Sequence, residues 1–247
     1  MTDYHIHIGQ FNEKYYDAFE IFRIIEKLSS KTKITEIHYS STSSCRCDVE
    51  LVRIEEEIKY AQNFISKKII TKPYLWFIPK YAEQRISVES VTKSFDYCGI
   101  KIHPAGQYWE ENNSNHLKAL HQIFRWADDN KKHILIHCGT QKCDLPTRFE
   151  QFFEEYKNAK IILAHSNPVF ETAQMVNKYD NVFCDTACIN KESFEQLKKE
   201  INDTKKILFG SDFPINNYWN KLLFNKSKSL SKEYKETCAI LKNLNYE

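Results

Sequence analysis

The chain has 247 residues, of which 42% are hydrophobic and 28% charged, an ordinary globular composition that can bury a sizeable core. A formal net charge of +2 gives no electrostatic reason to expect nucleic acid or a membrane as partner. There is neither a stretch of roughly 20 apolar residues to span a membrane nor a basic and apolar secretory signal, so we expect a cytoplasmic protein.

Short apolar runs rich in Ile, Val and Phe alternate along the chain with longer segments of helical period. The first run, DYHIHI at 3–8, predicts a strand, and a helix with one apolar face is expected after it. The apolar positions of that helix are Tyr15, Ala18, Phe22 and Ile25. Strands follow at 34–40 and 72–79, and then a helix is expected over residues 82–94, where apolar positions are sparse.

The second half of the chain continues the alternation. The strand at 97–103 precedes a helix whose apolar positions are Leu117, Leu120, Phe124 and Ala127. The strand at 133–138 precedes a helix marked by Phe149, Phe152, Phe153 and Tyr156. The last three strands are expected at 160–165, 181–186 and 205–211.

Eight strands, each followed by a helix, are what an α/β protein of the (β/α)8 TIM-barrel type requires at about 250 residues. No repeat, low-complexity tract or Pro/Gly/Ser linker divides the chain, so we expect one domain over residues 1–247. A doubly wound open sheet is the alternative, because strand alternation alone does not show that the sheet closes.

Catalytic groups of such barrels lie where the strands end. Ligand-type residues at these ends are His5, His7, Lys101, His103, His137, His165 and Asp212. Any one of these histidines alone is more simply a core residue, but the group falls together on one rim. Imidazoles plus a carboxylate are the ligands of catalytic zinc or a similar divalent ion. His116, His121 and His133 are instead expected on helices or low in the barrel.

The eight cysteines form no paired Cys-x-x-Cys units, which favours reduced thiols over a structural cysteine cluster.

Five segments resemble the amidohydrolase superfamily of metal-dependent hydrolases, more narrowly its amidohydrolase-related branch, which includes decarboxylases and hydratases. These segments are DYHIHIG, GIKIHP, ILIHCG, ILAHSNP and ILFGSDFP. The resemblance implies that His5, His7, His137 and Asp212 bind a divalent metal. It gives His165 either the role of a second-metal ligand or that of an acid/base.

The chemistry implied is hydrolysis of a small amide, ester or lactone. A divalent metal lowers the pKa of bound water from 15.7 toward about 7. Asp212 would take the proton of that water as attack begins, and His165 would orient the substrate or protonate the leaving group. Zinc is favoured, with manganese or iron as alternatives. One ion with an unmodified Lys101, facing substrate or a carboxylate, is preferred over two ions bridged by a carbamylated Lys101.

Four residues are expected to bind substrate: Lys101, His103, Arg46 and Trp109. Arg46 would pair with a substrate carboxylate or phosphate, or else is a solvated surface residue. Trp109 would wall the pocket, although core packing is the better explanation for any single aromatic taken alone. The loop Ser166-Asn167-Pro168 replaces the glycines of many relatives, so their substrates do not transfer to this chain.

Three other functions stay open. The first is a nonoxidative decarboxylase or hydratase of a small carboxylic acid, with the same metal ligands. The second is the superfamily's deoxyribonuclease branch, which is disfavoured because Lys101 stands where an acidic ligand is usual and no basic stripe is present. The third is metal binding without catalysis, which would leave His165 and Asp212 without a purpose. The expected partner is a small-molecule substrate, with a homo-oligomer left open.

Overall fold

One sheet contains the strands of the computed structural model, in the order β2-β1-β3-β4-β5-β6-β7-β8-β9. β2 pairs antiparallel with the end of β1, and every other neighbouring pair is parallel. The structure describes residues 1–45, 47–110, 112–224 and 228–243. The strands are β1 (Thr2–Phe11), β2 (Lys14–Tyr16), β3 (Glu36–Ser41), β4 (Ile70–Trp76), β5 (Gly99–Ile102), β6 (His133–His137), β7 (Lys160–Ala164), β8 (Val182–Asp185) and β9 (Ile207–Leu208).

The sheet closes between its first and last parallel strands. Tyr4 N donates to Phe209 O at 2.9 Å, and further along Asp212 N donates to His5 O at 2.8 Å. His7 N donates to Phe213 O at 2.8 Å, where a parallel bridge joins Ile6 and Phe213. The predicted TIM barrel is thereby confirmed over the open sheet, and closure itself brings the segment after β9 against the histidines of β1.

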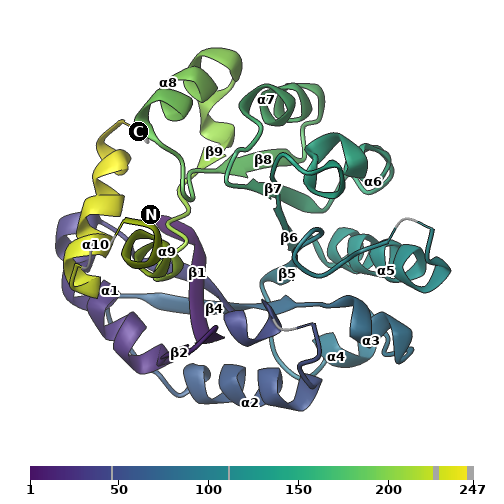
Figure 1. Cartoon of the computed structure of the whole chain (residues 1–247), viewed down its shortest axis with the longest axis horizontal. Helices are drawn as coiled ribbons and strands as arrows, with labels where there is room; N and C mark the ends of the chain where they lie inside the picture. The colour runs from purple at the N-terminus through teal and green to yellow at the C-terminus, as the bar shows by residue number, and fades with distance from the viewer. Residues whose placement is uncertain (46, 111, 225–227, 244–247) are drawn as a thin grey trace.

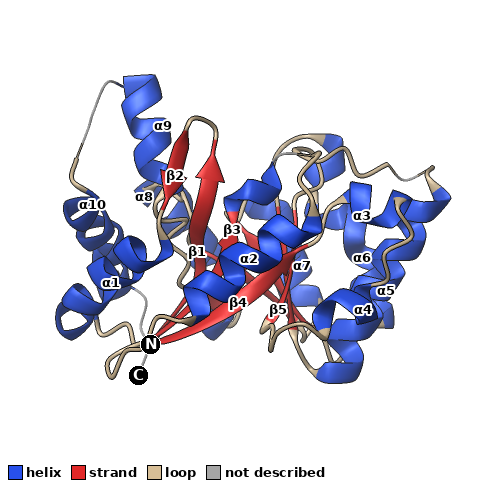
Figure 2. Cartoon of the chain, turned by 90° about the horizontal axis from the view of Figure 1, so that it is seen from below, coloured by secondary structure: helices blue, strands red, loops and turns tan. Residues whose placement is uncertain are grey.

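Helices surround the strands in a ring (Figure 1). They are α1 (Ala18–Thr32), α2 (Leu51–Gln62), α3 (Pro79–Glu83), α4 (Val88–Thr92), α5 (Ser114–Asn130), α6 (Glu150–Glu155), α7 (Val169–Lys178), α8 (Lys191–Glu200), α9 (Ile215–Phe224) and α10 (Leu230–Thr237). In Figure 2 the β1–β2 hairpin and α9 rise above the barrel on the side where β1 ends, and the N terminus lies at the opposite side. Within the described ranges, no helix is both long enough and apolar enough to cross a membrane.

The core has two parts. The larger cluster lies between the strands and the helices and includes Ile134, Ile136 and Phe124. A smaller cluster contains Leu135 and Ile162, which point to the other face of their strands and so fill the barrel interior. Because His133, Leu135 and His137 share one face of β6, this apolar layer separates the amino end of the interior from the carboxyl end.

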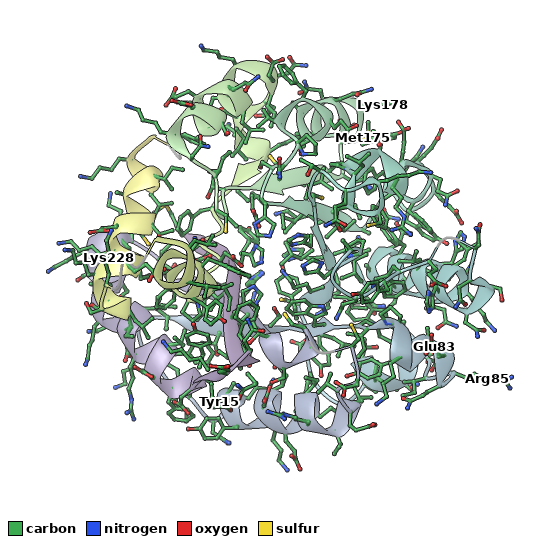
Figure 3. All side chains as sticks on the ribbon, in the orientation of Figure 1. Tyr15, Glu83, Arg85, Met175, Lys178 and Lys228 are labelled. Carbon is green, nitrogen blue, oxygen red and sulfur yellow. The ribbon has the colours of Figure 1, made fainter. Side chains whose placement is uncertain are left out.

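Two helices differ from their sequence predictions: the first begins later, and the third is divided into two. Tyr15 belongs to β2, where it pairs with Gln10, and it lies at the outer rim of the molecule (Figure 3). The helix after it starts later because the side chain of Asp17 accepts a hydrogen bond from Glu20 N and caps α1. The helix expected over residues 82–94 is two short helices, α3 and α4, interrupted at Arg85, which has a φ of 58°.

Candidate active site

Two histidines of β1 face the barrel interior near the end where the strands stop. His5 and His7 are 1% and 3% exposed. His5 Nδ1 lies 2.8 Å from Asp185 Oδ2, and His7 Nδ1 lies 3.1 Å from Ser40 Oγ. These contacts hold both rings with Nε2 toward Asp212 Oδ1, at 3.4 Å from His5 and 3.0 Å from His7.

Asp212 reaches the two histidines through the backbone that closes the barrel. Its N–H donates to His5 O at 2.8 Å, and its φ of 54° lies in the left-handed region that aspartate tolerates better than most residues. His5, His7 and Asp212 each offer one ligand atom, and these atoms lie within 4.8 Å of one another. The structure therefore brings together three of the four metal ligands that the sequence predicts.

His137, the fourth predicted ligand, lies at the end of β6 and is not part of this group of three. Its ring stacks on His103, with 3.6 Å between ring centroids and 13° between planes. Its Nδ1 lies 3.0 Å from His165 Nε2. His137 lines the same cavity as His7 and Asp212, and its role as a ligand stays a prediction.

His165 follows β7 with a φ of 69°, and its N–H donates to Asp185 Oδ1 at 2.8 Å. Its Nδ1 lies 3.3 Å from Ala187 O, so this nitrogen carries the proton and Nε2 is left to accept from His137. His165, Cys188 and Asp212 form a second group of ligand atoms within 4.8 Å of one another. The position suits either of the two roles expected for His165.

Lys101 is buried in the barrel between His5 and Trp76. Its Nζ lies 2.6 Å from His5 Nε2 and 4.9 Å from the centroid of the Trp76 ring. Burial lowers the pKa of Lys101. Nζ donates to the Nε2 lone pair of His5, whose Nδ1 proton is held by Asp185. The contact of Lys101 with substrate or a carboxylate stays a prediction.

Burial favours the neutral form of four imidazoles of the site, those of His7, His103, His137 and His165. It lowers the pKa of His7 and of His103 to about 3 each, and it lowers the pKa of His137 and His165 as well. Burial opposes the ionisation of Asp212, but the hydrogen bond to His7 and the nearby His5 and His165 outweigh it, so the pKa of Asp212 lies well below its usual value. Neutral imidazoles beside an ionised carboxylate are the protonation states that metal ligands need.

A cavity of about 710 Å³ opens above these groups. Its walls include the aromatic rings of Phe11, Trp76 and Trp219 and the polar side chains of Gln107 and Gln141. It is large enough for a small molecule, with apolar walls and a few convergent polar groups at the bottom.

The four residues predicted to bind substrate lie in different places. Lys101 and His103 line the cavity. Arg46 lies outside the described residues. Trp109 is 3% exposed and packs against Phe77 and His116 in the core, so it is not among the residues that line the cavity. Burying the indole there removes its apolar surface from water and stabilises the core.

Two residues of the site were not found by sequence reasoning. Asp185 ends β8 and binds His5 Nδ1, and Cys188 Sγ lies 3.1 Å from Asp212 Oδ2. The segment NVFCDT carries the signal for Asp185, because an aspartate at a strand end is the position that singled out the histidines. No sequence pattern marks Cys188.

The overall chain is similar to solved structures at low sequence identity. Dihydroxybenzoic acid decarboxylase from Polaromonas sp. JS666, with bound manganese and the inhibitor 2-nitroresorcinol, is 13% identical at a TM-score of 0.53, covering 99% of each chain. Amidohydrolase 2 from Bifidobacterium longum subsp. infantis is 14% identical at a TM-score of 0.53, covering 100% of this chain and 98% of that one. A TatD family hydrolase from Entamoeba histolytica is 11% identical at a TM-score of 0.55, covering 85% of this chain and 73% of that one.

These likenesses confirm the fold, and each of these neighbours is named as an enzyme or a member of an enzyme family. No curated protein matches the sequence. A family model described as Amidohydrolase matches residues 83–236, which is more than half of the chain, and the chain therefore belongs to the amidohydrolase family.

Proposed function

We propose that the protein is a metal-dependent hydrolase of a small amide, ester or lactone, carried by a single domain over residues 1–247. The observation that supports this most is the group of His5, His7 and Asp212 at the bottom of the cavity, with ligand atoms within 4.8 Å of one another. Membership of the amidohydrolase family supports the enzyme class, and the cavity supports a small substrate.

The donor set fits a divalent cation. Two imidazole nitrogens and a carboxylate oxygen converge, and both imidazoles are held by a partner on the other ring nitrogen, as metal-ligating histidines usually are. His137 is the fourth donor we assign, and zinc is the ion that this set favours, with manganese or iron as alternatives. When bound, such an ion acts as a Lewis acid that polarises a carbonyl and acidifies water.

The residues of the chain supply the proton transfers. Asp212 Oδ2, the carboxylate oxygen opposite the one that faces His5 and His7, is free to accept a proton once the Cys188 thiol turns away. His165 Nε2 carries a lone pair at the cavity wall, so it can take over the proton that Asp212 removes from water and then pass that proton to a leaving group. Asp212 therefore acts as the base and His165 as the acid.

A decarboxylase is the second candidate. Trp76, His103 and His137 form a stack of near-parallel rings beside the cavity, with 6.2 Å between the first pair of centroids and 3.6 Å between the second. Aromatic rings at the cavity wall suit a planar carboxylic acid. Both candidates use the same ligands, so the products decide between them.

The test is a screen of metal-loaded protein against small amides, esters, lactones and aromatic carboxylic acids. We expect one substrate class to turn over and Asp212→Asn to reduce kcat by roughly 10² to 10⁴-fold with the fold intact by circular dichroism. An acid paired with an amine or alcohol as product supports hydrolysis, and released carbon dioxide supports decarboxylation instead. Full activity in a folded Asp212→Asn variant would contradict the proposed mechanism.

A further inference from the structure

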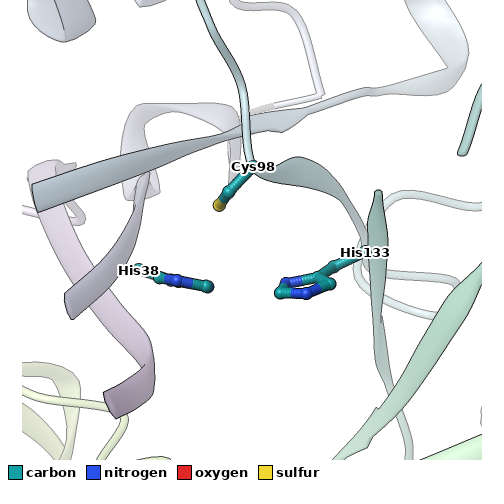
Figure 4. A group of neighbouring side chains, drawn as sticks. All are labelled: His38, Cys98 and His133. Carbon is teal, nitrogen blue, oxygen red and sulfur yellow. The ribbon is translucent and has the colours of Figure 1, made fainter. Parts of the chain in front are cut away.

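A second group of ligand-type side chains lies at the amino end of the barrel (Figure 4). His38 comes from β3, His133 is the first residue of β6, and Cys98 directly precedes β5. Each offers one nitrogen or sulfur atom, and these atoms lie within 4.8 Å of one another. Figure 4 shows the three side chains converging from three separate segments of the barrel.

This group is separate from the candidate active site. None of the three residues is among those that line the active-site cavity. On β6, His133 and His137 are divided by Leu135, which belongs to the apolar layer inside the barrel. The proposed active-site chemistry therefore does not use the two imidazoles and the thiol at this position.

The surroundings make these residues an unusual choice for packing alone. His38 is 2% exposed and Cys98 is 8% exposed. The interior of such barrels is ordinarily filled by Val, Ile and Leu, and burying imidazoles requires that their polar atoms be satisfied. Tyr74 OH lies 3.4 Å from His38 Nδ1 and 3.4 Å from His133 Nδ1, both long contacts, and its single proton can serve only one of them.

One ring nitrogen of His38 is held by a carboxylate, as the non-ligating nitrogen of a metal-binding histidine usually is. Its Nε2 lies 2.7 Å from Glu36 Oε1, so that Nε2–H donates to the carboxylate and Nδ1 keeps a lone pair. Burial lowers the pKa of His38, and it lowers the pKa of His133 to about 3. Both rings are therefore neutral at physiological pH.

We propose that His38, Cys98 and His133 bind one thiophilic d10 cation, Zn(II) or Cu(I), in a structural site that ties β3, β5 and β6 together. Two imidazoles and one thiolate are a ligand set that these ions favour. Ligand atoms around such an ion lie roughly 3.5 Å apart, so side-chain shifts of about 1 Å close the present separation.

Binding exchanges the thiol proton of Cys98 for the metal, and that proton leaves to solvent. Burial raises the pKa of this thiol, while Lys72 and Lys132 lower it. Glu36 accepts from His38 Nε2 and also lies 3.1 Å from Lys72 Nζ, so part of its charge is already balanced by that lysine. The thiolate neutralises Cu(I) fully, whereas Zn(II) keeps a positive charge that Glu36 offsets only in part.

The test uses Co(II) as the spectroscopic probe for the zinc case, in a Cys188→Ser background. In the described chain, Cys98 and Cys188 are the two thiols that belong to a group of ligand atoms, and this background removes Cys188. A thiolate-to-cobalt charge-transfer band in the near ultraviolet therefore reports on the group of His38, Cys98 and His133. Because the candidate active site also takes a divalent cation, we expect the band to reach its full intensity by two equivalents of Co(II). It should fall at least tenfold in intensity when Cys98→Ser or His133→Gln is added.

Cys238→Ser in the same background is the matched control, because Cys238 is also buried but belongs to no group of ligand atoms in the described chain. Its band should be unchanged. A parallel titration delivers Cu(I) from a chromophoric Cu(I) chelator to the Cys188→Ser protein and to its Cys98→Ser and His133→Gln derivatives. Loss of one bound equivalent of either cation in the Cys98→Ser and His133→Gln proteins supports the site. Unchanged binding of both cations in either folded variant overturns it.

Discussion

Asp185 connects three parts of the candidate active site. Its Oδ2 accepts the Nδ1 proton of His5 at 2.8 Å, and its Oδ1 accepts the backbone N–H groups of His165 and Ala187 at 2.8 Å and 3.0 Å. Burial raises its pKa, but His5 and His165 outweigh that effect, so Asp185 stays ionised. It thereby fixes the tautomer in which His5 Nε2 is free to bind a metal.

Asp185→Asn should weaken binding of a divalent metal by about 10- to 100-fold, because an amide cannot hold the His5 Nδ1 proton as a carboxylate does. Competition with a chromophoric chelator measures the affinity. Asp144→Asn is the control. Asp144 lines the same cavity, but its carboxylate accepts a hydrogen bond from Ala105 N and not from a metal-binding histidine, so the variant should keep the wild-type metal affinity. Equal affinity of both variants would remove Asp185 from this role.

Lys101 decides how many ions the site holds. With its Nζ directed at His5 Nε2, it lies where a cation would bind, and we predict one ion beside an unmodified lysine that turns away. The crystal structure of metal-loaded protein should show one anomalous peak at His5, His7 and Asp212. Two peaks about 3.5 Å apart, bridged by density that continues from Lys101, would instead mean a carbamylated lysine and a ligand role for His165.

At the level of elements, the first βα unit shows how local chemistry sets a boundary. The apolar period would extend the helix back to Tyr15, but the Asp17 side chain accepts from Glu20 N at 2.9 Å and satisfies a donor that the first turn leaves free. Asp17 also accepts a hydrogen bond from Tyr60 OH of α2 at 3.0 Å. One side chain therefore both starts α1 and links it to the next helix.

Asp17→Ala should lower the free energy of unfolding by about 1 kcal/mol, the usual loss for an N-cap aspartate. Urea denaturation followed by circular dichroism gives the value. Asp17→Asn keeps an acceptor oxygen and should lose much less. If both substitutions cost the same, the negative charge rather than the cap would be responsible.

At the level of the whole molecule, Asp3 joins the beginning of the barrel to its end. Its Oδ1 accepts from Ser211 N at 3.1 Å, and its Oδ2 accepts from Tyr234 OH of α10 at 3.1 Å. Burial raises the pKa of Asp3 from 3.8 to about 7, even though these hydrogen bonds and one from His5 N oppose the shift. The folded chain therefore binds the Asp3 proton more tightly than the unfolded chain does.

The sign of the pH dependence follows from linkage. Between pH 3.8 and about 7 the folded state holds more protons at Asp3, so the Asp3 contribution to stability is complete below that window and is lost as pH rises through it. Asp3→Asn should gain stability relative to wild type across the same window, by at most on the order of 4 kcal/mol. Denaturation curves at pH 4, 6 and 8 measure this difference. A difference that does not change with pH would contradict the raised pKa.

The sequence by itself determined the eight parallel strands and the ligand-type residues at their ends, because apolar alternation and strand ends are local properties of the chain. It also determined that His5 and His7 share a face, since side chains alternate along β1. Only the tertiary structure decided that the sheet closes, which brings Asp212 against His5 through a backbone hydrogen bond between residues 207 positions apart.

The same holds for the side chains whose partners are distant in sequence. Asp185 meets His5, His137 stacks on His103, and Trp109 turns into the core, all through contacts across strands or helices. Likewise, His38 and His133 are too far apart along the chain for any spacing rule to pair them with Cys98. Such contacts depend on strand register and on competition for buried space, which are settled only when the whole barrel packs.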